Sequence, residues 1–95
     1  PEPSRVFSEM VRVCKPGGRL FVRDLCRPNS LGEVEALVEL YAKNESTSCQ
    51  QLFRQSLLAA LCLVEVQQLV EQLGFPPETV CLVSDRHWTW SVQRP

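Results

Sequence analysis

The sequence predicts an α/β fold in which about four helices pack against a small sheet. Apolar side chains recur at helical spacing in four segments, the first being 4–14. Leu20-Phe21-Val22 is a continuous apolar run, which is typical of a buried strand, and Trp88, Trp90 and Val92 alternate with polar residues, as in a half-exposed strand. No linker or repeat interrupts the chain, so residues 1–95 are expected to form a single unit.

The first helix is expected over 4–14, with Ser4 as its N-terminal cap. Pro16 cannot continue the helix, and the two glycines that follow it supply a turn. A strand should therefore start directly after this turn.

The other three helices lie between the predicted strands. Ser30 and Glu33 form a capping box that opens the second helix, because serine stands at the cap and glutamate three residues later. The next two helices are expected over about 49–61 and 63–73. Gly74 is placed to end the last one in a left-handed conformation, and two prolines prevent its resumption.

Three strands are expected, over 19–25, 79–83 and 87–93. The last two are close enough in sequence to form an antiparallel hairpin. The first reads as a strand covered on both faces, and one such strand cannot make a parallel sheet alone. Its neighbours must come from sequence outside these residues, from a second copy of the chain, or from the hairpin.

Composition excludes several classes of function. Ten basic residues against eleven acidic ones give a net charge of −1, so no basic surface for nucleic acid is indicated. The longest apolar stretch, 56–66, is too short to cross a bilayer. The five cysteines are scattered, without metal-binding spacing, and most are expected to be small buried hydrophobes, with Cys26 and Cys49 as the better candidates for reactive thiols. Together with the absence of an export signal, they favour a cytoplasmic location and no metal site.

Three segments in order resemble one known family. The run from Phe7 to Asp24, through Lys15-Pro16-Gly17-Gly18, resembles the helix, the "LKPGG" turn and the fifth strand of class I S-adenosylmethionine-dependent methyltransferases. The segment 61–66 is similar to the last helix of that family, although Cys62 stands where a threonine cap is usual, and thiols cap poorly. The segment 80–90 resembles strands six and seven.

The resemblance implies a partial Rossmann-like methyltransferase fold, with one buried strand and a C-terminal hairpin in a small mixed sheet. In that family the fifth and sixth strands run parallel and the seventh runs back. The intact family binds S-adenosylmethionine through a glycine-rich loop after its first strand. No such loop occurs here, and Gly17-Gly18 precedes a strand instead of following one. We therefore expect no cofactor-binding residue in this chain, no S-adenosylmethionine binding by it alone, and no catalysis by the isolated 95 residues.

The same topology brings two segments to one substrate-facing rim, because ligands of open α/β sheets sit beyond the carboxyl ends of the strands. The residues expected there are Asp24, Arg27, Asp85, Arg86 and His87.

Two of these are candidate catalytic residues. Asp24 could orient or deprotonate a nucleophile, or it could simply pair with Arg23 or Arg27 or cap a loop. His87 could act as a general base, or be a structural hydrogen-bonding group. Asp85 and Arg86 most simply form a polar turn with a local ion pair, and Trp88 and Trp90 most simply pack under a helix.

Two functions remain open from the residues. The chain is either the C-terminal, substrate-side part of a methyltransferase, inactive alone, or a non-catalytic module that self-associates through the open edge of the strand 19–25. Its partner is accordingly the N-terminal methyltransferase half, which could be encoded separately, or a second copy of itself. No membrane partner is indicated.

Overall fold

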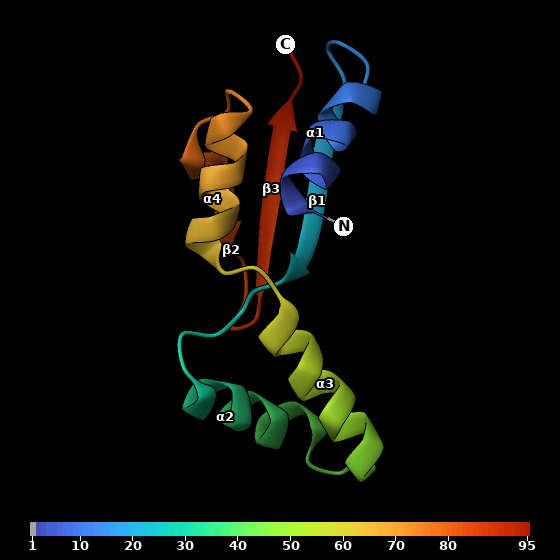
Figure 1. Cartoon of the computed structure of the whole chain (residues 1–95), viewed down its shortest axis with the longest axis vertical. Coiled ribbons are helices and arrows are strands. Elements are labelled where there is room, and N and C mark those ends of the chain that lie inside the picture. Colours follow the sequence, from blue (N-terminus) through green and yellow to red (C-terminus); the bar gives the residue numbers. More distant parts are fainter. Residues whose placement is uncertain (1) are drawn as a thin grey trace.

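The computed structural model describes residues 2–95 as four α-helices and a three-stranded sheet (Figure 1). The helices are α1 (Pro3–Val13), α2 (Leu31–Ala42), α3 (Thr47–Ala59) and α4 (Leu63–Gln72). The strands are β1 (Arg19–Leu25), β2 (Val80–Leu82) and β3 (His87–Gln93), and a 3-10 turn over Pro77–Thr79 leads into β2. The predicted mixture of helices and strands is confirmed.

The sheet has the order β1-β3-β2, with β3 in the centre. Both pairs are antiparallel: Arg19 to Leu25 of β1 face Gln93 to His87 of β3, and β2 pairs with the first half of β3. The predicted hairpin is confirmed. The prediction of a mixed sheet is wrong, because β3 runs between β1 and β2 and keeps these two parallel strands from pairing.

The main core lies between the sheet and two helices, α1 and α4, which cover the same face of it (Figure 1). Successive side chains of a strand point to opposite faces, so Trp88, Trp90 and Val92 all enter this core. Trp90 is fully buried, stacked on Phe7 at 5.6 Å and in edge contact with Phe75 at 5.4 Å between ring centroids. Packing of both tryptophans under helices is confirmed.

Strand β1 is covered on one face only, which corrects the prediction of a strand buried on both. Leu20 and Val22 pack against the core, but Phe21 between them is 65% exposed. The reason is that α1 and α4 lie on the same side of the sheet. Among the described residues no helix covers the opposite face.

Helix α1 begins differently from the prediction. Glu2 is its N-cap and Pro3 its first residue, a position that suits the fixed φ of proline, so Ser4 is not the cap. The turn after α1 needs a left-handed residue, which Gly17 supplies with φ of 79°. This turn is tied to the C-terminal segment, because the Gly17 N–H donates to the Arg94 carbonyl at 2.8 Å.

Helices α2 and α4 are delimited by the predicted signals. The Ser30 hydroxyl accepts a hydrogen bond from the Glu33 N–H at 3.1 Å, although the Glu33 carboxylate accepts from Asn29 rather than from Ser30. Gly74 ends α4 with φ of 91°, and the N–H of Phe75 donates to the Val70 carbonyl at 3.0 Å. Helix α3 begins at Thr47, earlier than predicted, because Ser46 is available as its cap.

Helices α2 and α3 follow one another through a short turn and pack at an angle as a pair, here called the arm, which projects beyond the carboxyl end of β1 (Figure 1). Its own small core consists of Val34, Leu37 and Leu57. An ion pair between Arg54 and Glu35, 2.6 Å between nitrogen and oxygen, joins the two helices on their outer side. The arm makes the molecule long, about 45 Å against 21 and 20 Å in the other two directions.

The cysteines are less buried than their sequence context predicts. Cys49 and Cys81 are exposed, and the other three are half-buried, so the expectation of buried small hydrophobes is wrong for this structure. Cys14, Cys26, Cys49 and Cys62 lie at or beside element ends, and Cys81 lies on the exposed side of β2, so none reaches the centre of a core.

Candidate functional site

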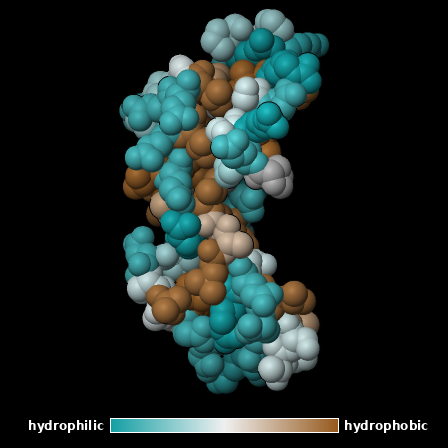
Figure 2. Space-filling model, viewed as in Figure 1, coloured by the Kyte–Doolittle hydropathy of each residue, from teal (hydrophilic) through white to brown (hydrophobic). Residues whose placement is uncertain are grey.

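A cleft of about 550 Å³ lies at the carboxyl ends of β1 and β2, between the sheet and the arm. Segment 26–29 after β1, helix α2, the start of α4 and the turn before β3 all contribute to it. Figure 2 shows apolar surface where the arm joins the sheet. Beyond the carboxyl ends of strands is where open α/β sheets bind ligands, so this cleft is the candidate site.

The walls of the cleft are apolar and open to solvent. Leu40 of α2 is 66% exposed, Val64 of α4 57% and Leu82 of β2 54%, and all three line the same cleft. Large apolar side chains left exposed around one concavity favour binding of an apolar group, because each Å² they lose to a ligand is favourable.

Arg27, one of the predicted rim residues, lines the cleft but its charge is already paired. Its guanidinium lies 3.0 Å from the Glu65 carboxylate and donates a further bond to the Ala60 carbonyl at 3.3 Å. The pKa of Glu65 is lowered mainly by the hydrogen bond that its carboxylate accepts from the Cys62 N–H, and further by the charge of Arg27. Through these contacts Arg27 links the segment after β1 to the start of α4.

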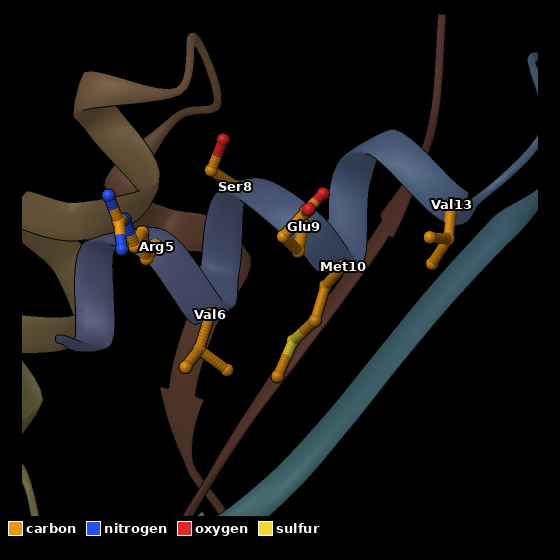
Figure 3. A pocket seen from close by; sticks show the side chains of 6 residues that line it. All are labelled: Arg5, Val6, Ser8, Glu9, Met10 and Val13. Atoms are coloured by element: carbon orange, nitrogen blue, oxygen red, sulfur yellow. The ribbon is translucent and has the colours of Figure 1, made fainter. Parts of the chain in front are cut away.

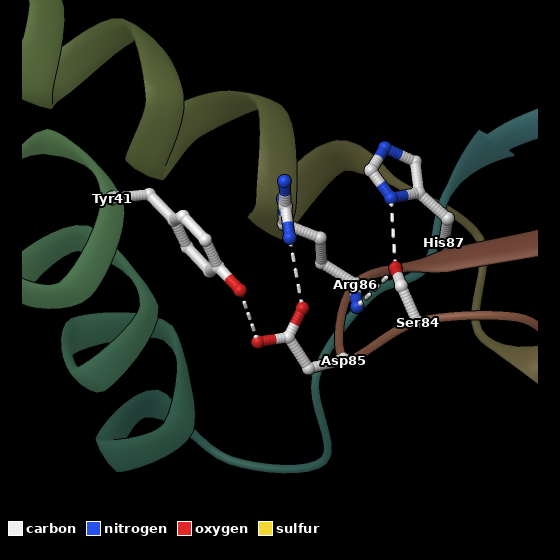
Figure 4. A network of polar contacts seen from close by, with 5 residues as sticks. All are labelled: Tyr41, Ser84, Asp85, Arg86 and His87. Atoms are coloured by element: carbon white, nitrogen blue, oxygen red, sulfur yellow. Dashed lines mark hydrogen bonds and ion pairs between the residues drawn. The ribbon is translucent and has the colours of Figure 1, made fainter.

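Asp85 and Arg86 form the predicted local ion pair, 2.9 Å apart, and Tyr41 of α2 completes it (Figure 4). The Tyr41 hydroxyl donates to Asp85 at 2.6 Å, and the Arg86 guanidinium lies over the Tyr41 ring, 3.8 Å from its centroid. The hydrogen bond between Tyr41 and Asp85 raises the pKa of Tyr41 and lowers that of Asp85. Tyr41 is not among the predicted rim residues, because residue types alone do not show that its hydroxyl meets the turn at Asp85, 44 positions further along the chain.

His87 contacts Ser84, a residue that was not predicted to belong to the site. The His87 Nδ1 is 2.9 Å from the Ser84 hydroxyl, which also accepts a bond from the Arg86 N–H at 3.2 Å (Figure 4). Burial, and then the charges of Arg23 and Arg86, lower the pKa of His87. Both effects favour the neutral ring, which has one nitrogen without a proton. Ser84 lines the cleft and stands between it and the ring.

Asp24 is not brought together with the other predicted rim residues. It lies on the helix-covered face of the sheet, opposite Trp88, and lines a separate hollow of about 210 Å³ beside Phe7. Its carboxylate accepts a bond from the N–H of Leu25 at 2.8 Å. Within residues 2–95 it forms no ion pair, so neither of the predicted arginine partners reaches it.

The two candidate thiols differ in their surroundings. Cys26 lines the cleft, and burial raises the pKa of its thiol, which keeps it protonated and weakly nucleophilic. Cys49 is exposed in the first turn of α3, away from the cleft. Neither thiol therefore adds reactive chemistry to the cleft.

Over the described range, 2–95, no group of three or more histidine, cysteine or acidic side chains could hold a metal ion. In the same range no helix has both the length and the apolar character needed to cross a membrane. No protein-family model, curated protein or solved structure matches the chain. The function is therefore inferred from the cleft and its side chains.

Proposed function

We propose that the chain is the C-terminal, substrate-side part of a class I S-adenosylmethionine-dependent methyltransferase. The observation that carries this is the position of the cleft, at the carboxyl ends of β1 and β2, with Ser84 on its wall and His87 in hydrogen-bond contact with Ser84. Parallel β1 and β2 with β3 running back between them are also the strand directions that the resemblance implies.

The part played by these residues is to position an acceptor and to take up its proton. Methyl transfer needs an in-line approach more than it needs covalent catalysis, so a shaped wall is a large share of the task. His87 can accept a proton through Ser84, since the two are in hydrogen-bond contact. Asp85 is bonded to Tyr41 and Arg86, and these contacts stabilise the turn that carries Ser84 and His87.

The residues described do not fit S-adenosylmethionine itself. Gly17 and Gly18 are the one Gly-Gly pair in the sequence, and their N–H groups are already bonded, to the carbonyls of Arg94 at 2.8 Å and Lys15 at 2.9 Å. They lie before β1, at the end of the strand opposite the cleft. The cofactor would therefore be held by an N-terminal half supplied by other residues.

The proposal is tested by restoring that half. Residues 1–95 are fused behind the first four strands of a class I methyltransferase of established activity, and S-adenosylmethionine is titrated by calorimetry. We expect saturable micromolar binding by the fusion and none by the 95 residues alone. The control pair is Val66→Asp, at a fully buried position, which should abolish binding, and Val83→Asp, at a position 50% exposed, which should not. A fusion that unfolds cooperatively but takes up no cofactor would contradict the proposal.

A second candidate function, self-association, is favoured by the surface beside the free edge of β1. Val6, Met10 and Val13 project from one side of α1 into an open hollow of about 820 Å³ (Figure 3). Val13 is 70% exposed, and β1 pairs within residues 2–95 with β3 only. An unpaired strand edge flanked by apolar side chains can pair with a second copy. Light scattering would then show a dimer at micromolar concentration; a stable monomer would exclude this function.

A further inference from the structure

The chemistry of the cleft limits what it can hold, beginning with charge. Arg27 is paired with Glu65, and Asp85 is paired with Arg86 and Tyr41. The carboxylate of the remaining charged residue of the lining, Glu33, accepts a bond from the Asn29 N–H at 2.9 Å. An anionic ligand group would lose hydration on entering and would meet no unpaired cation, since Arg27 is held by Glu65. Glu33, which forms no ion pair within residues 2–95, would repel such a group, so the cleft favours a neutral ligand over an anion.

The hydrogen-bonding capacity of Ser84 limits the ligand further. A hydroxyl has one donor and two acceptor positions, and the Arg86 N–H occupies one of the acceptors. His87 Nδ1 occupies a second position, as acceptor or donor according to its tautomer. The position left for the cleft is a lone pair in one tautomer and a hydrogen in the other. A ligand hydroxyl satisfies both cases, because it can donate and accept.

The walls and the volume of the cleft indicate what the rest of the ligand looks like. Leu40, Val64 and Leu82 offer apolar surface from three different elements around a space of about 550 Å³. That volume is in the range of sites for small organic molecules. Polar residues of the lining come from the segment after β1, from α2 and from the turn before β3, and among them the Ser84 hydroxyl keeps a hydrogen-bonding position open.

We propose that the cleft binds a neutral small molecule with an apolar body, of the size of an aromatic ring or larger, and a single hydroxyl group placed at Ser84. Its role as the methyl acceptor rests on the proposed function; its binding to the 95-residue chain does not.

The probes are p-cresol, toluene, which lacks the hydroxyl, and p-toluate, which replaces it with a charge. Binding is followed from NMR shifts of the leucine and valine methyl groups. We expect p-cresol to shift Leu40, Val64 and Leu82 with millimolar affinity, and p-toluate to bind at least about 10-fold more weakly. Equal affinity for p-cresol and p-toluate would overturn the proposal.

Two leucines provide a matched pair of variants that should both fold. Leu40 in the cleft and Leu52 on α3 outside it are 66% and 64% exposed. Leu40→Asp should weaken p-cresol binding at least about 10-fold, because it removes apolar wall and introduces a charge. Leu52→Asp should change it less than about twofold. An equal loss in both would show unspecific binding and contradict the proposal.

Ser84→Ala tests the hydroxyl contact. It should lower the affinity for p-cresol about fivefold, the usual effect of one neutral hydrogen bond, and leave that for toluene unchanged. An unchanged p-cresol affinity would refute the placement of the hydroxyl. If p-cresol binds as described while the fusion described above takes up no S-adenosylmethionine, the cleft proposal stands and the methyltransferase proposal fails.

Discussion

Replacing Leu57 by alanine should unfold the arm while leaving the sheet and its two helices folded. Leu57 is fully buried, and with Val34 and Leu37 it makes up the buried core between α2 and α3. A buried leucine-to-alanine change costs about 2–5 kcal/mol. None of these three side chains belongs to the core around Trp90, and from the sheet Leu25, at the end of β1, packs against them, so most of the cost falls on the arm.

The effect can be resolved because the two parts carry different probes. Both tryptophans lie in β3, in the main core, so their fluorescence reports the sheet. Helices α2 and α3 have 12 and 13 residues against 11 and 10 in α1 and α4, so the arm supplies about half of the helical circular dichroism. In a urea titration, Leu57→Ala should lose that half before the tryptophan transition, which stays in place.

Leu58→Ala is the matched control, since Leu58 is the next residue of α3 and is 43% exposed. It should shift either transition by less than about 1 kcal/mol. If Leu57→Ala moves the circular dichroism and fluorescence transitions together and by the same amount, the two cores form one cooperative unit and the reasoning is refuted.

Three further predictions concern single groups. Because the folded pKa of Glu65 is lowered, chiefly by the Cys62 N–H, its contribution to stability is present above its unfolded pKa and is lost as pH falls. The stability difference between the wild type and Glu65→Gln, followed by urea denaturation, should therefore be full at pH 7, begin to fall near the unfolded pKa of about 4.3 and disappear only below the lowered folded pKa. A difference that stays constant down to acid pH would contradict this. Gly74→Ala should destabilise the chain by about 1–2 kcal/mol because of the positive φ, whereas Gly32→Ala, inside α2, should stabilise it by about 0.5–1 kcal/mol; equal effects would contradict this. By NMR titration His87 should have a midpoint below 6.5, and stability should fall as pH drops through that range because the folded state disfavours the charged ring; a higher midpoint would remove it as a base at neutral pH.

Features governed by neighbouring residues could be predicted from the sequence. The alternation of Trp88 and Trp90 correctly placed both under helices, and Ser30 and Gly74 correctly marked a helix start and a helix end. The prediction that both faces of Leu20-Phe21-Val22 are buried is wrong, since Phe21 is exposed. Which face of a strand is covered depends on where distant helices lie, and α1 and α4 both cover one side.

The candidate site was predictable in outline but not in its contacts. The strand directions that the resemblance implies predicted one rim for the end of β1 and the turn before β3, and in the structure Arg27 and Asp85 line one cleft. The separation of Asp24 follows from strand parity, because it shares a face with Val22 and Trp88. The partnership of Ser84 with His87 depends on the turn geometry, which residue types alone do not specify.

The most direct test of the account is hydrogen exchange of the β1 amides that do not bond to β3, measured in the 95 residues alone and in the methyltransferase fusion. If β1 is an inner strand whose neighbour is supplied by an N-terminal half, these amides exchange rapidly in the chain alone at every concentration. They become at least about 100-fold slower in the fusion, because a strand then pairs with this edge. Slow exchange in the chain alone, with protection that increases with protein concentration, would contradict the account. It would indicate that a second copy of the chain pairs there instead.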